Sequence, residues 1–75
     1  MTIDEFIVFF RTLFDSDFSE ELTPETEFRY LDDWGSLMAV VFIAEVLEKY
    51  GKIVPTAEMR KTETIEELHR LVSSL

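Results

Sequence analysis

The sequence contains no cysteine, and only two of its 75 residues are glycine and two are proline. Without cysteine, neither a disulfide framework nor a thiolate metal site can stabilise the fold. The absence suits a reducing compartment. It also means that any chemistry that requires a thiol must take that thiol from a cofactor.

Long hydrophobic runs are missing as well. The longest one, Leu37 to Ala44, falls far short of the roughly 20 apolar residues that span a bilayer. The acidic start, MTIDEF, lacks the positive charge that opens a signal peptide. A chain of this length has no room for a second core. We therefore predict one monomeric domain, residues 1–75, that is soluble in the cytoplasm and does not insert into membranes.

Basic residues are few. Seven lysines and arginines stand against 16 aspartates and glutamates, which gives a formal charge of −9. This balance argues against nucleic acid as a partner, because phosphate backbones require a basic surface. An anionic membrane would also repel the chain. The charge favours a protein partner with a basic surface, attracted over long distances. The alternative, that the acids only confer solubility, stays open.

Hydrophobic residues recur at spacings of three and four along much of the chain, which is the pattern of amphipathic helices. Thr2 with Glu5, and Thr64 with Glu67, have the spacing of capping boxes. The predicted fold is all-α, an irregular four-helix bundle whose outer two helices pack antiparallel to the central one. The predicted helices are Ile3–Phe14, Ser36–Tyr50 with its end at Gly51, a short turn at Thr56–Met59, and a last helix that begins after Thr64.

Residues 15–35 form a long, acidic connection between the first and second predicted helices. Such a loop is uncommon inside a compact domain and is often functional. Five hydrophobic residues are expected to fold it back onto the core, with Trp34 as a packing anchor: Leu22, Phe28, Tyr30, Leu31 and Trp34.

The second predicted helix is hydrophobic nearly all round. Such a helix is either buried or meets a partner, and a domain this small can hardly bury one helix completely. The remaining arc mixes acids with apolar residues, among them Met38, Val41, Glu45 and Glu48. The side assigned to the core consists of Ala39, Val40, Phe42, Ile43, Val46, Leu47 and Tyr50.

No set of cooperating catalytic groups stands out. His69 is the only histidine, and we expect it at the surface or at the core boundary. Ser36 lies in WGSLM, which lacks the second glycine of a nucleophile elbow. The acidic loop has oxygens at alternate positions, but Glu20 occupies the place of the turn glycine of a calcium loop. We therefore predict neither catalysis nor a metal site.

Ser36 stands where the second helix is predicted to begin, and two roles fit this position. A serine at a helix start commonly caps the helix. A helix N-terminus also presents unpaired N–H groups and partial positive charge, which stabilise a phosphate diester attached to the hydroxyl. Gly35 removes side-chain bulk beside that hydroxyl, and the acidic loop before it offers a modifying enzyme charges to bind.

Four short motifs, in order and at matching spacings, resemble those of the acyl carrier protein family. DDWGSL stands where the family has its Asp-Ser-Leu motif, and LEKYG matches the end of the helix that follows. IVPTAE resembles the next connection, and TIEEL resembles the start of the last helix. The likeness covers nearly the whole chain and is nearest to free-standing carriers with a DWDSL signature.

By this resemblance, Ser36 carries 4′-phosphopantetheine, which a magnesium-dependent phosphopantetheinyl transferase takes from coenzyme A. The thiol of the arm then holds acyl or aminoacyl groups as thioesters, which would supply the thiol that the chain lacks. Family members use the exposed part of the second helix to meet acyl-transfer or condensing enzymes with basic surfaces. The corresponding partner-binding residues here are Asp32, Asp33, Leu37, Met38, Val41, Glu45 and Glu48.

Three positions depart from the family pattern. Gly35 replaces the aspartate before the modified serine, which removes a possible salt bridge to an arginine of the transferase. Val41 and Leu47 stand where fatty-acid carriers often have acids, which favours a specialised lipid, polyketide or peptide-type pathway. The alternative is an unmodified helical interaction module of carrier-like fold, which binds a partner helix through Met38, Val41 and their neighbours.

Overall fold

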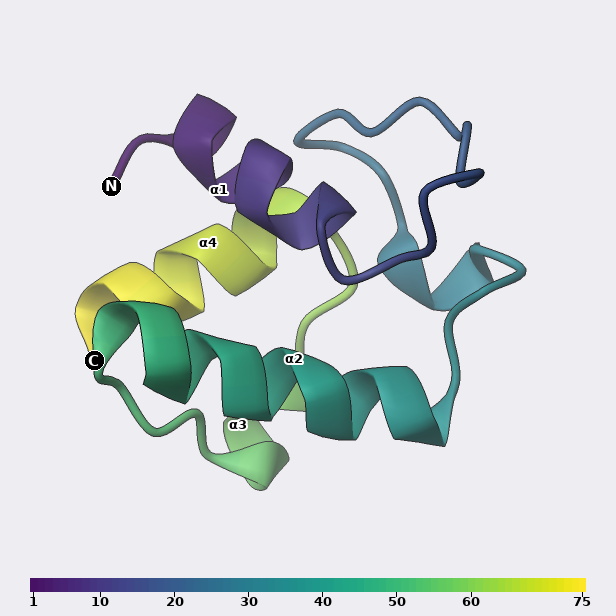
Figure 1. The fold of residues 1–75 in the computed structure, drawn as a ribbon. Helices are drawn as coiled ribbons and strands as arrows, with labels where there is room; N and C mark the ends of the chain where they lie inside the picture. The colour runs from purple at the N-terminus through teal and green to yellow at the C-terminus, as the bar shows by residue number, and fades with distance from the viewer.

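A computed structural model describes residues 1–75 and confirms an all-α fold (Figure 1). None of the helices combines the length and apolar character that crossing a membrane requires. The elements, in chain order, are α1 (Ile3–Arg11), the 3₁₀-helix η1 (Phe28–Tyr30), α2 (Ser36–Tyr50), α3 (Thr56–Met59) and α4 (Ile65–Ser74).

The helix directions differ in part from the prediction. In Figure 1, α1 and α2 run in opposite directions, whereas α2 and α4 both end on the left of the view. The prediction of an antiparallel α4 is therefore wrong. The connection through α3 carries the chain back toward the right of the view, and α4 then begins beside α1.

Capping boxes begin both α1 and α4, as predicted. The Thr2 hydroxyl accepts from the Glu5 N–H at 3.1 Å, and the Glu5 carboxylate accepts from the Thr2 N–H at 2.8 Å. At α4, the Glu67 carboxylate accepts from the backbone N–H groups of Glu63 and Thr64 at 2.7 and 3.0 Å. These backbone hydrogen bonds stabilise the ionised form and lower the pKa of both carboxyl groups.

The first helix is shorter than predicted. It ends at Arg11, and Leu13 and Phe14 lie in turns closed by hydrogen bonds to the residues three positions before them. The Thr12 hydroxyl donates to the Phe9 carbonyl and so competes with the helical backbone pattern. Phe14 packs instead against Phe18, with ring centroids 4.3 Å apart, at the start of the long loop.

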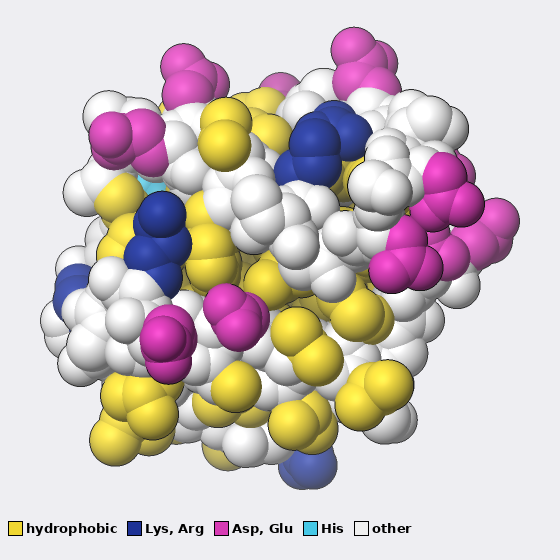
Figure 2. Space-filling view, viewed as in Figure 1, with side chains coloured by type: hydrophobic (Ala, Val, Ile, Leu, Met, Phe, Trp, Pro, Cys, Tyr) yellow, Lys and Arg dark blue, Asp and Glu magenta, His cyan; other side chains and the backbone are white.

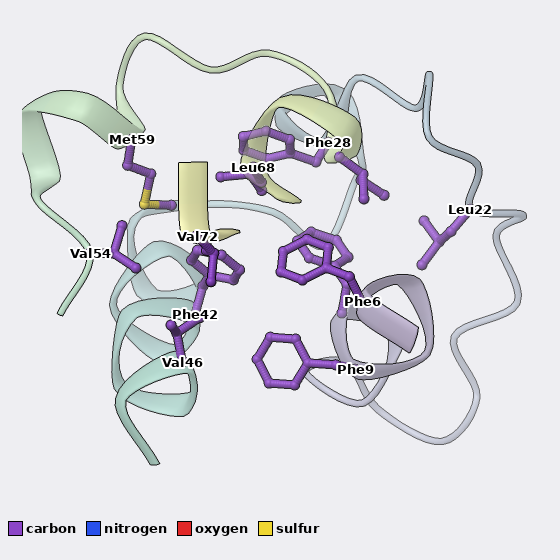
Figure 3. Close-up of a cluster of buried hydrophobic side chains, with 12 residues drawn as sticks. Phe6, Phe9, Leu22, Phe28, Phe42, Val46, Val54, Met59, Leu68 and Val72 are labelled. Carbon is purple, nitrogen blue, oxygen red and sulfur yellow. The ribbon is translucent and has the colours of Figure 1, made fainter. Parts of the chain in front are cut away.

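Aromatic rings from α1 and α2 form the centre of the core (Figure 3). Phe42 lies at 6.1–6.3 Å from the ring centroids of Phe6, Phe9 and Phe10. The buried hydrophobic residues are Phe6, Phe9, Phe10, Leu22, Phe28, Phe42, Val46, Val54, Met59, Ile65, Leu68 and Val72.

The long loop folds back onto this core, but not through all five predicted residues. Leu22 and Phe28 are buried and Leu31 is half-buried, whereas 82% of Tyr30 is exposed. In a 3₁₀-helix the residues at i and i+3 share one side, so Phe28 and Leu31 face the core and Tyr30 points away. The loop is also tied to α4, because the Ile65 N–H donates to the Thr26 carbonyl at 3.1 Å.

Tyr50, in the last turn of α2, packs its ring against Phe9 at 5.3 Å. Its phenol oxygen is buried without a hydrogen-bond partner, and burial, followed by the charge of Glu5, raises the pKa of Tyr50. We expect Tyr50→Phe to raise the free energy of unfolding by about 1 kcal/mol, because an unsatisfied hydroxyl no longer has to be desolvated.

The same variant should change the alkaline limb of stability. Because the folded-state pKa of Tyr50 lies above its ordinary value of 10.0, the unfolded chain ionises first and the wild type loses stability as pH rises past 10.0. Urea unfolding of both proteins at neutral pH and above this value measures both effects. A variant that is less stable at neutral pH would show that the hydroxyl has a partner.

Candidate functional site

Ser36 is the first residue of α2, and its side chain is exposed. The residue that caps the helix is Gly35, whose extended backbone supplies no side-chain hydrogen bond. The Ser36 hydroxyl makes no hydrogen bond within the protein and so does not act as the cap. A Cβ built on Gly35 meets no atom of the rest of the chain within 4 Å, so the space on the side-chain position of Gly35 is open.

The start of α2 differs from the starts of α1 and α4. Its first internal bond runs from the Ala39 N–H to the Gly35 carbonyl at 3.0 Å. The N–H groups of Ser36, Leu37 and Met38 therefore have no acceptor within the chain. The first turn of α2 contains no acid, whereas α1 and α4 each have two there. Of these three helix starts, only that of α2 leaves its positive potential uncompensated by side chains.

Trp34 holds this helix start in place. Its ring stacks on Phe10 with centroids 5.9 Å apart and meets the edge of Phe28 at 4.9 Å. The backbone N–H of Trp34 donates to the Leu31 carbonyl at 3.0 Å, which closes the turn that ends the loop. Trp34 is half-buried, so the prediction of a packing anchor is confirmed. The peptide before Ser36 is thus fixed to the core although Ser36 itself is exposed.

The seven predicted partner-binding residues differ in exposure. Leu37 is 76% exposed, and Glu45 and Glu48 are exposed further along α2. With about 100° of rotation per residue, these three lie within roughly 80° of one another around the helix. Met38 and Val41 are half-buried. The two remaining residues, Asp32 and Asp33, are exposed in the turn after η1.

Two residues assigned to the core face solvent instead. Val40 is 63% exposed and Leu47 is 51% exposed. They lie about 120° and 100° around α2 from the buried Val46. The four-residue α3 is too short to cover this side along the whole of α2. Figure 2 shows hydrophobic side chains gathered over α2 in the lower half of the view, while acids lie over the α1–α2 loop, near the start of α1 and toward the end of α2.

A groove of about 530 Å³ lies beside Ser36, a feature that the sequence did not predict. Arg29 borders it and donates from Nε to the Thr62 carbonyl at 2.9 Å and from Nη2 to the Met59 carbonyl at 2.8 Å. No spacing pattern in the sequence links the residues that line the groove. They come from η1, from α2 and the two residues before it, and from α3 and the residue after it. The full lining is Arg29, Trp34, Gly35, Ser36, Ala39, Val40, Ile43, Thr56, Met59 and Arg60.

Comparisons with known proteins returned nothing for this chain. No family model matches it, and neither the curated proteins nor the solved structures contain a match.

Proposed function

We propose that this chain is a cytoplasmic carrier protein of the acyl carrier type, modified at Ser36 with 4′-phosphopantetheine and not itself an enzyme. The observation that carries the proposal is the free Ser36 hydroxyl at the acid-free start of α2. A serine that served only as a cap would accept a hydrogen bond from the helix backbone, and Ser36 accepts none.

The residues around Ser36 fit a phosphodiester. The free N–H groups of Leu37 and Met38 and the positive end of α2 favour a negative charge at this point. Gly35 contributes no carboxylate that would repel it and leaves space for it. When bound, the phosphopantetheine arm supplies the thiol that this cysteine-free chain lacks, on which acyl or aminoacyl groups are carried as thioesters.

The proposed partners are a phosphopantetheinyl transferase, with coenzyme A and magnesium, and acyl-transfer or condensing enzymes with basic surfaces. The formal charge of −9 would attract such enzymes over long distances. Leu37 would provide apolar contact beside the attachment point, and Glu45 and Glu48 would provide charges along the same face. The exposed Asp32 and Asp33 extend that charge across the loop, while Met38 and Val41 contribute their half-exposed surfaces. The pathway we favour is a specialised lipid, polyketide or peptide-type pathway.

A second candidate function is supported by the exposed side of α2. Leu37, Val40 and Leu47 are apolar and more than half exposed, and they lie on one helix face, with Leu37 and Val40 one turn apart and Leu47 two turns further along. An unmodified interaction module would bury this face against a partner helix. Gly35, which replaces the usual aspartate, is compatible with both functions.

The two functions differ in what a transferase does to the chain. We would incubate the apo-protein with coenzyme A, magnesium and a broad-specificity transferase, and then measure its intact mass. The carrier gains the mass of one phosphopantetheine, Ser36→Ala gains nothing, and Ser19→Ala, which alters an exposed serine of the loop, reacts like the wild type. The interaction module is favoured instead if the wild type gains no mass with any transferase while Gly35→Asp is modified readily.

Gly35→Asp also has an expected effect on stability. Its backbone is extended and a Cβ meets no neighbour, so aspartate fits without strain. The new carboxylate can accept from the free N–H of Leu37 or Met38 and should raise the free energy of unfolding by about 0.3 kcal/mol. Thermal unfolding at low and high salt measures this gain, with Gly35→Ala as the control. A loss of stability on substitution by aspartate would show that the start of α2 is already satisfied.

A further inference from the structure

The side chain of Arg60 is the one basic side chain of this acidic protein that makes no contact with a partner group. Ion pairs engage only Lys61 and Arg70, with Glu58 and Glu66. The other basic side chains bond to backbone carbonyls or lie over a ring, namely Arg11, Arg29, Lys49 and Lys52. Arg60 makes no side-chain hydrogen bond, ion pair or ring contact, and it lines the groove beside Ser36.

The charge of this groove is opposite to that of the protein. None of its ten lining residues is acidic, although the chain contains 16 acids. Arg29 and Arg60 both border it, and the partners of Arg29 are neutral carbonyls, so neither positive charge is neutralised by a carboxylate. The other large groove, between α1 and α2, is lined by Glu5 and Glu45 as well as Lys49. Of the two grooves, only the one beside Ser36 therefore has basic residues and no acids in its lining.

The shape of the groove suits an elongated group attached at Ser36. Its lining follows α2 from Ser36 to Ile43, about 10 Å along the helix axis. Trp34, Ala39 and Met59 provide an apolar wall, and Arg60 directly follows the short helix α3. A phosphate attached to Ser36 would face the free N–H groups of α2, which would leave the two arginines available for another anion.

We propose that Arg60 makes this groove selective for tethered groups that end in a carboxylate. The occupant is the acyl cargo carried from Ser36, and the inference in this respect rests on the proposed function. Its chain lies along the apolar wall, and its terminal carboxylate pairs with the Arg60 guanidinium, with the charge of Arg29 in support. Tethering raises the local concentration of the carboxylate to the millimolar range, so a solvent-exposed pair can form without intrinsic high affinity. The apolar wall strengthens the attraction by excluding water from one side.

The test attaches the cargo chemically and so needs no transferase. Because the chain has no cysteine, Ser36→Cys provides a single thiol for methanethiosulfonate reagents. We would attach a short and a long alkyl tether, each with a ¹³C-labelled terminal carboxylate, and measure the carboxylate pKa by NMR. The same tethers would be attached in the Arg60→Gln and Lys61→Gln backgrounds. Lys61, which is paired with Glu58 and does not line the groove, is the matched control.

We expect the long tether's carboxylate to titrate about half a pH unit lower in the Arg60 protein than in Arg60→Gln, because a nearby positive charge favours the ionised form. Lys61→Gln should leave this pKa unchanged. An equal pKa in the Arg60 and Arg60→Gln proteins would overturn the proposal. A difference confined to the short tether would also overturn it, and would assign Arg60 to the anion at Ser36 itself.

The two proposals fail separately. A chain that gains no mass from coenzyme A is not a carrier, whatever the tethers show. A chain that does gain this mass but gives the same carboxylate pKa with and without Arg60 is a carrier without selectivity for acidic cargo. Arg60 is exposed and its side chain makes no bond in the fold, so Arg60→Gln is expected to fold like the wild type.

Discussion

Replacing Phe10 with alanine is expected to leave most of the chain unfolded in water at room temperature. Phe10 is completely buried, and its ring contacts the rings of Phe28, Trp34 and Phe42 at centroid distances of 5.9–6.1 Å. Truncating a buried phenylalanine costs about 3–5 kcal/mol, which combines lost transfer energy with the cavity left behind. A core of this size rarely supplies more than about 3–5 kcal/mol in total.

Urea unfolding followed by circular dichroism measures this effect. Tyr30→Ala is the matched control, because it also removes an aromatic ring but one that is 82% exposed, and its effect should stay within about 0.5 kcal/mol. Phe10→Leu should lie between the two. If Phe10→Ala and Tyr30→Ala unfold at the same urea concentration, the aromatic cluster does not hold the fold together.

Replacing Arg29 with methionine is expected to lower the free energy of unfolding by about 2 kcal/mol. The side chain loses two charge-assisted hydrogen bonds, to the carbonyls of Met59 and Thr62, each worth about 1.5–3 kcal/mol when sheltered. We expect less than their sum because Arg29 is partly exposed. The Met59 carbonyl also keeps the bond from the Thr62 hydroxyl at 2.6 Å. Methionine keeps an apolar stem beside Phe28, over whose ring the guanidinium of Arg29 lies at 5.1 Å.

Arg60→Met is the control for Arg29→Met, since it removes the same charge from the same groove but no hydrogen bond. Its expected effect on stability is below about 0.5 kcal/mol. Amide hydrogen exchange should locate the loss in Arg29→Met at the connection between α3 and α4. Equal losses in the two variants would mean that net charge, and not the two carbonyl bonds, makes Arg29 stabilising.

Local signals in the sequence predicted those parts of the fold that depend on neighbouring residues. The pairs Thr2–Glu5 and Thr64–Glu67 form capping boxes because a cap needs only one turn of helix. Gly51 ends α2 in the left-handed conformation, with φ of 67°, that glycine adopts without strain. The exposed position of Ser36 followed from the same reasoning about a single helix start.

The predictions that the structure contradicts concern which side chains this small domain can cover. Val40 and Leu47 were assigned to the core because they are apolar, and their exposure depends on the short length of α3, a tertiary property. Tyr30 was misplaced because the turn of η1 was not anticipated. The groove beside Ser36 could not be predicted at all, since Arg29 reaches it by bonds to residues 30 and 33 positions later in the chain.

The state of Ser36 in the protein isolated from its own cells tests the central proposal most directly. Intact-mass measurement, followed by fragmentation, reports both the mass of any attached group and the residue that bears it. We predict a mass above that of the bare sequence by one phosphopantetheine, alone or acylated, with the added group on Ser36. Protein that carries no addition in cells with an active transferase, or an addition on a different serine, would contradict the account.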